Sequence, residues 1–227
     1  MIQPDNLIRL YSGSSPLFVL PDFVLFPKTG HQFRIFEQRY IDMVGHAIEH
    51  EKFITLSLLK DGWKENYEGS PHIHEIGTLS YIVDYKKLAN GEYSILLLGL
   101  SKVQINEAEQ THPYRICATT FLNEITNLFG EDEKKKLLIK QFEKLLQIVD
   151  EDVSIQVFNN PEFSLEIMIN MICVMIPIPA IEKQKMLELQ DINLRYEILI
   201  HFINAEISAE REGQQILPVL PITQLMD

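Results

Sequence analysis

The chain has 227 residues, of which 46% are hydrophobic, and a formal net charge of −12 at pH 7. This length is enough for one large domain or for two smaller lobes, each with its own core. Because binding to phosphate backbones requires clustered Lys and Arg, the acidic balance argues against a broad nucleic-acid-binding face, and we expect no nucleic-acid partner.

From Pro16 to about Leu122, short β-branched and aromatic runs separated by turn residues predict β-strands. Asn90-Gly91 should supply the positive φ angles of a tight hairpin turn. Apolar residues at spacings of three and four predict one helix from Glu37 to His50. We expect a small, strongly bent sheet or pseudobarrel with this one inserted helix. The predicted strands are Pro16–Leu20, His31–Ile35, Phe53–Leu59, Gly77–Tyr85, Tyr93–Leu98, Val103–Glu107 and Tyr114–Phe121.

After Asn127 the apolar spacing changes to that of helices. Acidic residues from Glu131 to Glu133 open the first helix, where negative charge favours the helix dipole. The second helix, near Ser164 to Met175, is apolar almost all round and should be central. A third follows from Ala180 to Leu189, and the last begins near Asp191, which is a candidate cap. This half of the chain is therefore predicted to be an α-helical bundle.

These patterns predict an α+β protein with a β lobe at residues 1–125 and a helical lobe at residues 126–212. An extended apolar tail follows at residues 213–227. Exposure of such a strip would invite association, so we expect it to pack on its own chain or on a partner. A homodimer formed through the tail is one alternative.

The cysteines and the N-terminus indicate a reducing, cytoplasmic location. Cys117 and Cys173 each lie in an apolar run, which is typical of buried thiols rather than of a disulfide. Residues Met1–Asn6 lack the basic and apolar regions of a secretory signal. The longest apolar stretch, Ile167–Ile178, is too short to span a bilayer, so no membrane association is expected.

The sequence shows almost no motif typical of catalysis or cofactor binding. A phosphate-binding loop needs a Gly-Lys pair, and the sequence contains none. The zinc-protease motif needs a second His four residues after the first, but Ile54 and Thr78 occupy those positions after His50 and His74. His72 and His74 would share one face of an extended segment, yet no further ligands complete a metal site. We therefore expect no catalytic residue, metal or cofactor.

Aromatic residues crowd around Pro21 and Pro27. Large rings carry much of the binding energy at protein interfaces, and a loop this apolar should leave some of them at the surface. At least half of them should nevertheless be structural, because alternate residues of a strand point inward. The candidate polypeptide-binding residues are Phe23, Phe26, Phe33, Phe36 and Tyr40.

Several residues in this region have predicted architectural roles. Gly77 and Gly99 fall within or at the ends of strands, where a missing side chain permits a bulge or a sharp bend. Arg39, on the first turn of its helix, is a candidate anchor for Glu37 or for a carbonyl group.

The order of motifs along the chain resembles a known family. In the first half these motifs are Pro16-Leu-Phe-Val-Leu-Pro-Asp-Phe-Val-Leu-Phe-Pro27, Phe36-Glu-Gln-Arg-Tyr40, Ile76-Gly-Thr, Leu88-Ala-Asn-Gly-Glu-Tyr93, Leu98-Gly-Leu100 and Pro113-Tyr-Arg115. In the second half they are Ile176-Pro-Ile-Pro179, Glu182-Lys-Gln-Lys-Met-Leu187 and Asn193-Leu-Arg-Tyr196. From about Pro16 to Arg211, this order resembles the N-terminal substrate-recognition domain of Lon-type ATP-dependent proteases.

The resemblance implies a PUA-like β lobe, a helical lobe, and a role in capturing unfolded or tagged polypeptides for an ATPase and a Ser-Lys peptidase. The chain ends where a full-length Lon would continue into its ATPase, so we expect a stand-alone form without either activity. The predicted function is non-catalytic polypeptide binding, as a substrate adaptor in protein quality control. Two alternatives remain open, namely RNA binding by the PUA-like lobe and small-molecule binding in a cleft between the lobes.

Overall fold

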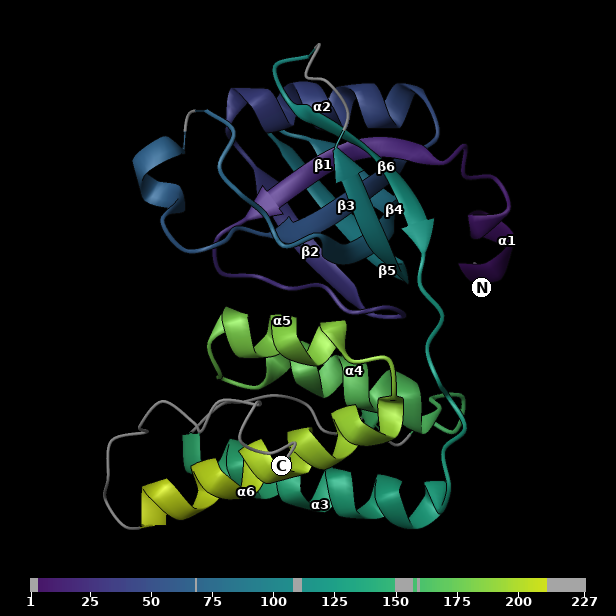
Figure 1. Cartoon of the computed structure of the whole chain (residues 1–227), viewed down its shortest axis with the longest axis vertical. Coiled ribbons are helices and arrows are strands. Elements are labelled where there is room, and N and C mark those ends of the chain that lie inside the picture. Colours follow the sequence, from purple (N-terminus) through teal and green to yellow (C-terminus); the bar gives the residue numbers. More distant parts are fainter. Residues whose placement is uncertain (1–3, 68, 108–111, 150–156, 159, 212–227) are drawn as a thin grey trace. The chain divides into compact units, whose positions relative to one another are not determined.

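The computed structural model describes residues 4–67, 69–107, 112–149, 157–158 and 160–211. The chain divides into a β unit, Met1–Asn123, and a helical unit, Glu124–Asp227 (Figure 1). The tail predicted at residues 213–227 lies outside the described residues. Within the described residues, no helix combines the length and the apolar character needed to cross a membrane.

The β unit is a six-stranded sheet in the order β2-β5-β4-β3-β1-β6. Because β5 also pairs with β6, the sheet curls into a barrel (Figure 1). All neighbouring strands are antiparallel except β1 and β3. The predicted pseudobarrel is confirmed. Its strands are β1 Ser14–Leu20, β2 Gly30–Ile35, β3 Phe53–Leu58, β4 Ile76–Lys87, β5 Tyr93–Glu107 and β6 Arg115–Phe121.

Strand β5 corrects one prediction, since a single strand replaces the two expected at Tyr93–Leu98 and Val103–Glu107. Its pairing with β4 steps from Ser80↔Gly99 to Leu79↔Ser101, so the chain bulges between them instead of leaving the sheet. Of the bulge or sharp bend predicted at Gly99, the structure shows the bulge. A Cβ there would lie 2.4 Å from the Phe26 carbonyl oxygen, which explains why a side chain is absent.

The hairpin between β4 and β5 also differs in detail from the prediction. Leu88 N–H donates to the Glu92 carbonyl at 2.8 Å, and Gly91 N–H donates to the Leu88 carbonyl at 3.0 Å. Gly91 has a φ of 88°, but Asn90 is not among the residues with positive φ. Instead, the Asn90 side chain accepts a hydrogen bond from Glu92 N–H at 3.3 Å. The turn is thus a three-residue loop in which only the glycine adopts the left-handed conformation.

Helix α2, Gln38–Glu49, is the predicted inserted helix and covers one side of the barrel (Figure 1). Tyr40, Met43, Val44 and Ala47 form its buried face, which has the spacing expected of an amphipathic helix. Two short helices, α1 Pro4–Ile8 and the 3-10 helix η1 Trp63–Asn66, were not predicted. Elements of four or five residues are too short to show a periodic pattern.

The helical unit contains α3 Glu131–Val149, α4 Leu165–Met175, α5 Ala180–Glu188 and α6 Ile192–Arg211. The predicted cap is present, because Asp191 Oδ1 accepts from Asn193 N–H at 2.8 Å. Ser164, which was not predicted as a cap, caps α4 by accepting from Ile167 N–H at 3.3 Å through Oγ. Helix α4 is largely buried, as expected for the central helix of the bundle. The predicted helical lobe is therefore confirmed.

A buried arginine joins the helices of this unit. Arg195 of α6 is 0% exposed and donates to Asn170 Oδ1 on α4 at 2.8 Å and to the Met186 carbonyl on α5 at 2.9 Å. It also forms an ion pair with Glu124 at 2.5 Å, at the start of the unit. Four separate segments of the helical unit thus converge on one guanidinium group.

Both cysteines are buried thiols, as predicted. Cys117 lies within β6 and Cys173 within α4. Burial raises the pKa of the Cys173 thiol to about 12. This thiol therefore stays protonated at neutral pH and behaves as a small apolar side chain.

Candidate functional site

Two of the five candidate aromatic residues belong to the core of the β unit. Phe26 is 0% exposed and Tyr40 is 5% exposed. The Tyr40 hydroxyl donates to the Val19 carbonyl at 3.1 Å, and its ring packs edge-on against Phe18 with 4.7 Å between centroids. Burial raises the pKa of Tyr40 above its ordinary value. Neither ring is accessible to a partner, so both stabilise the fold.

Phe23 and Phe33 are half-buried and contact each other. Their rings meet edge-to-face with centroids 5.1 Å apart, and Phe23 also lies 4.3 Å from the His31 ring. Phe33 in β2 contacts Phe18 in β1, with 5.5 Å between centroids. The structure thus brings these two candidates together in a small cluster that joins β2 to the preceding loop.

Phe36 is the most exposed of the five candidates. Its exposure is 66%, whereas the adjacent Ile35 is 2% exposed. Phe36 lies between the end of β2 and the start of α2, where strand alternation turns it away from the barrel interior. A large apolar ring at such a position is available for contact with another molecule.

The turn that carries Phe36 is held by a network of charged and aromatic side chains. The Glu37 carboxylate accepts from Arg39 at 2.9 Å and from the Tyr67 hydroxyl at 2.8 Å. Arg39 also donates to the Tyr67 carbonyl at 3.1 Å, and its guanidinium lies 4.4 Å from the Tyr67 ring centroid. The prediction that Arg39 anchors Glu37 or a carbonyl is confirmed, because it contacts both.

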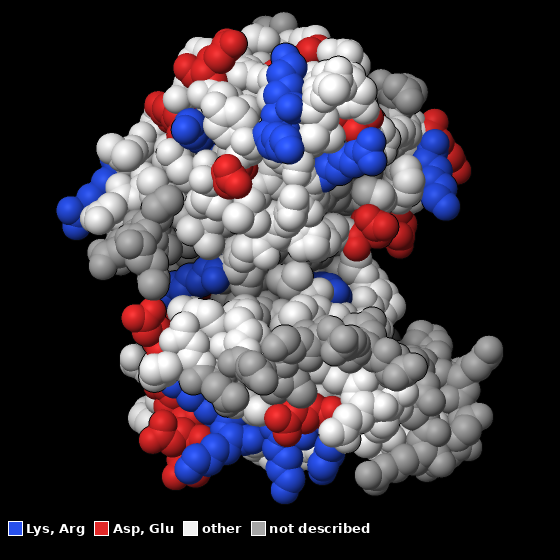
Figure 2. Space-filling model, turned by 180° about the vertical axis from the view of Figure 1, so that it is seen from behind, with Lys and Arg blue, Asp and Glu red and all other residues white. Residues whose placement is uncertain are grey.

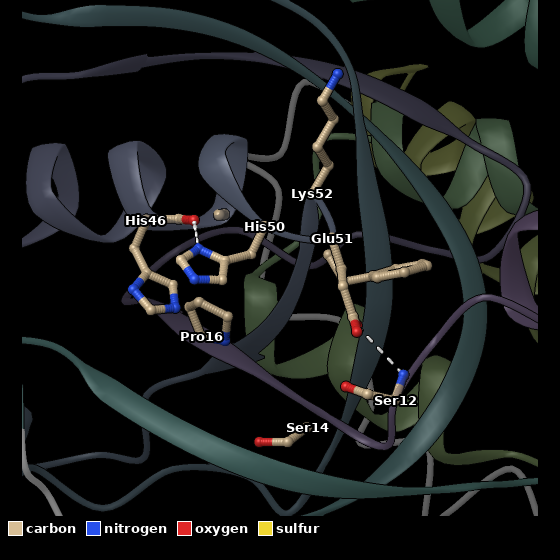
Figure 3. Close-up of a pocket in the computed structure, with 9 residues that line it drawn as sticks. Ser12, Ser14, Pro16, His46, His50, Glu51 and Lys52 are labelled. Carbon is tan, nitrogen blue, oxygen red and sulfur yellow. Dashed lines mark hydrogen bonds between the residues drawn. The ribbon is translucent and has the colours of Figure 1, made fainter.

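A first pocket of about 180 Å³ lies at the C-terminal end of α2 (Figure 3). The His46 and His50 rings stack with centroids 4.2 Å apart, and His50 Nδ1 donates to the His46 carbonyl at 2.8 Å. Figure 3 shows the Lys52 side chain pointing away from these rings. The lining residues are Ser12, Ser14, Pro16, His46, Ala47, His50, Glu51, Lys52 and Phe53.

The histidines of this pocket do not form a metal site. Stacked imidazole rings do not aim their nitrogen atoms at one point, as metal ligands must. Among the described residues, no group of three or more His, Cys, Asp and Glu side chains could hold a metal ion. Burial, followed by the neighbouring His50 and His112, lowers the pKa of His46. This lowering favours neutral imidazole at physiological pH.

A second pocket of about 190 Å³ contains two arginines that sequence reasoning did not connect. Arg115 of β6 donates through Nη1 to the Pro71 carbonyl at 2.9 Å, and Arg39 of α2 is held by the network described above. The two residues are distant in sequence and line the same pocket only in the folded structure, so no spacing rule could have paired them. The lining residues are Leu17, Val19, Arg39, Tyr40, Gly69, Pro71, Pro113, Tyr114 and Arg115.

The family model of the ATP-dependent protease La (LON) substrate-binding domain matches residues 14–205. This match extends across most of both units. The chain belongs to the Lon substrate-binding domain family. The predicted resemblance is therefore confirmed, and the candidate aromatic residues and both pockets fall within the matched Lon domain, apart from Ser12 of the first pocket.

Curated relatives of the chain include Lon proteases. The Lon protease of Chloroherpeton thalassium is 24% identical over 212 residues, which cover 91% of this chain and 25% of the relative. The Lon protease of Buchnera aphidicola from Acyrthosiphon pisum is 26% identical, over 85% of this chain and 25% of the relative. The chain therefore spans about a quarter of the length of the curated relatives it matches.

Solved structures of isolated Lon N-terminal domains share the fold. The N-terminal domain of Lon protease from the Mycobacterium avium complex aligns with a TM-score of 0.61 and 16% identity, over 84% of this chain and 98% of that domain. A Lon N-terminal domain protein from Xanthomonas campestris has the same TM-score at 19% identity, over 83% of this chain and 98% of that protein. The β barrel followed by helices is thus the architecture of this domain.

Proposed function

We propose that this Lon-type domain binds unfolded polypeptide through Phe36, supported by the neighbouring Phe23 and Phe33. The observation that carries the proposal is the 66% exposure of Phe36 on a turn that Arg39 and Glu37 hold in place. A turn that is held in place before binding loses little backbone conformational entropy when a partner covers its side chain. Membership of a substrate-binding domain family supports the same role.

The expected contribution of Phe36 is large enough to measure. Burying an exposed Phe side chain contributes about 1.5–3 kcal/mol, and 1.4 kcal/mol corresponds to about a tenfold change in affinity. Contacts of this kind are weakly selective for sequence, because any chain that exposes apolar side chains can supply them. Selectivity for unfolded over folded polypeptide follows, since folded chains bury most such groups.

The distribution of charge favours this proposal over RNA binding. The sequence carries 20 basic and 32 acidic residues. On the face shown in Figure 2, Lys and Arg side chains are interspersed with Asp and Glu side chains. Apolar capture should persist at high salt, whereas phosphate binding weakens steeply as salt increases.

In this proposal the domain performs no chemistry itself. It acts as a non-catalytic adaptor that holds polypeptide for an ATPase and peptidase, supplied by the same chain or by a partner. The lack of a Gly-Lys pair in the sequence supports this division of roles.

The test is a titration of a labelled, permanently unfolded polypeptide, followed by fluorescence anisotropy at low and high salt. The Phe36→Ser variant should bind about tenfold or more weakly than the wild type. Phe129→Ser is the matched control, because Phe129 is 80% exposed but belongs to the helical unit. Both variants should unfold in urea within about 0.5 kcal/mol of the wild type, since each replaces an exposed side chain.

Two results would oppose the proposal. Equal binding by the Phe36→Ser variant and the wild type would remove Phe36 from the binding surface. Preference for the folded form of the same polypeptide would contradict recognition of unfolded chains.

A further inference from the structure

Strand β2, Gly30–Ile35, lies at an open edge of the sheet. Strands β5, β4, β3, β1 and β6 form the closed ring, and β2 is attached to β5 outside it. In the part of the chain that the structure describes, no strand pairs with the other side of β2. An edge strand presents unpaired backbone N–H and C=O groups, with which a strand from another molecule can pair.

The register determines which backbone groups of β2 point away from β5. Opposite residues of an antiparallel pair alternate between those that exchange hydrogen bonds and those that do not. One position before the Gly30↔Leu98 pair, Gly99 N–H donates to the Thr29 carbonyl at 2.8 Å. In steps of two from Thr29, the residues of β2 that bond to β5 are therefore His31, Phe33 and Ile35. The residues whose N–H and C=O groups point to the free edge are Gly30, Gln32 and Arg34.

The other neighbour of β5 gives the same assignment. Leu88 N–H donates to the Glu92 carbonyl at 2.8 Å at the hairpin between β4 and β5. Counting on in steps of two, Ser94 and Leu96 of β5 bond to β4. The residues of β5 that remain for β2 are Tyr93, Ile95 and Leu97, which lie opposite Ile35, Phe33 and His31.

The free edge is exposed, and its own side chains are directed toward β5. Gly30, Gln32 and Arg34 are all exposed. Gln32 Nε2 donates to Ser94 Oγ at 2.8 Å, and Arg34 Nε pairs with the Glu92 carboxylate at 2.6 Å. Because buried backbone groups are nearly always paired, the unpaired groups of these exposed residues face solvent.

Aromatic rings lie on the inward face of β2. Phe33 is half-buried and contacts the Phe23 ring, with 5.1 Å between centroids. A strand added beside β2 would place every second side chain on this same face, next to these two rings. Phe36, which is exposed, follows the end of β2 directly. The edge therefore suits an extended segment that has an apolar residue at every second position.

We propose that the free edge of β2 binds an extended segment of an unfolded polypeptide as an added strand, whose backbone pairs with Gly30, Gln32 and Arg34. The inference rests on the proposed polypeptide-binding function and adds how the bound backbone is held. Pairing between main chains supplies affinity without requiring a particular sequence. An unfolded chain has backbone groups available for such pairing, whereas a folded chain has already paired most of its own.

The first experiment compares three forms of one short labelled peptide in which Val and Thr alternate. One form is unmodified, one is N-methylated at every Val and one at every Thr. Successive N–H groups of a strand point to opposite edges, so only one methylated form lacks the N–H groups that face β2. Fluorescence anisotropy should show that this form binds the wild-type protein at least about tenfold more weakly than the unmodified peptide. The other methylated form should bind within about twofold of the unmodified peptide.

The second experiment compares Gln32→Pro with Gln32→Ala. Both variants lose the Gln32 side chain, but only Gln32→Pro loses the N–H group that points to the free edge. Proline is tolerated in an edge strand where the missing N–H would face solvent, so pairing with β5 should persist. Gln32→Pro should bind the unmodified peptide about fivefold more weakly than Gln32→Ala. Urea unfolding verifies that both variants fold, and if Gln32→Pro does not, the three peptide forms on the wild-type protein still decide the inference.

Several results would overturn the inference. These are an equal effect of methylation at Val and at Thr, and equal binding by folded Gln32→Pro and Gln32→Ala. A dimer in analytical ultracentrifugation that Gln32→Pro dissociates would also overturn it, because β2 would then pair with a second copy of the chain. In each case, binding of unfolded polypeptide that depends on Phe36 would leave the proposed function standing. No binding of unfolded polypeptide by the wild type would contradict both.

Discussion

At the scale of single residues, burial decides which of the five candidate aromatic residues can contact a partner. The alternation rule predicted that at least half of the five candidates would be structural. It could not say which ones, because Phe26 lies in an irregular loop and Tyr40 faces inward only through the orientation of α2. Arg39 and Glu37 are close in sequence, and their pairing could be predicted. Arg115 lines the same pocket as Arg39, but its position depends on strand pairing and could not be predicted from the sequence.

The histidines at the end of α2 give a prediction on pH. His46 has a pKa below its ordinary value, because it is partly buried and lies near His50 and His112, while Glu49 acts in the opposite direction. The unfolded chain therefore binds a proton near pH 6.5 that the folded state binds only at lower pH. The contribution of His46 to stability should be fully present above about pH 6.5 and should be lost as the pH falls below it.

His46→Gln should weaken this dependence on pH. The measurement is urea unfolding at pH 7.5 and at pH 5.5, followed by circular dichroism, for the wild type and the variant. The loss of stability between the two pH values should be smaller in the variant. Both proteins keep the neighbouring Tyr114 ring, which packs near His46 with 5.9 Å between centroids, so the comparison isolates the His46 side chain. Equal losses would show that His46 is not responsible.

At the scale of elements, the existence of most helices and strands follows from the sequence. Hydrophobic periodicity and turn residues predicted the inserted helix, the hairpin and the four helices seen in the described part of the second unit. The continuous β5 was missed because its bulge interrupts the alternation that marks a strand. A bulge at Gly99 was nevertheless predictable from its missing side chain. The structure adds the reason, because a Cβ there would meet the Phe26 carbonyl.

The helical unit depends on Arg195 as the junction between its elements. Arg195→Met should lower the free energy of unfolding by about 3–5 kcal/mol, because the Glu124 carboxylate loses its cation in a buried setting. Chemical unfolding followed by circular dichroism measures the change. Arg34→Met is the control, because the exposed pair of Arg34 with Glu92 is screened by solvent and should contribute little to stability. Similar losses in both variants would contradict a junction role for Arg195.

At the scale of the whole molecule, the change of hydrophobic period near Asn127 predicted a β part followed by a helical part. Composition and hydrophobic periodicity did not predict the function, because the sequence analysis found no catalytic motif to recognise. The order of motifs across both halves carried the resemblance, and the family match over residues 14–205 confirms it. The proposed binding surface could be chosen only with three-dimensional information, since exposure separates Phe36 from its buried neighbours.

The most direct test of polypeptide recognition at Phe36 is photo-crosslinking. A photoreactive phenylalanine derivative is introduced at position 36, and in a separate protein at position 129, which is also an exposed Phe. Each protein is irradiated with the labelled unfolded polypeptide, and crosslinked product is quantified. The proposed function predicts strong crosslinking from position 36 and little from position 129. Equal crosslinking from both positions, or none from position 36, would contradict it.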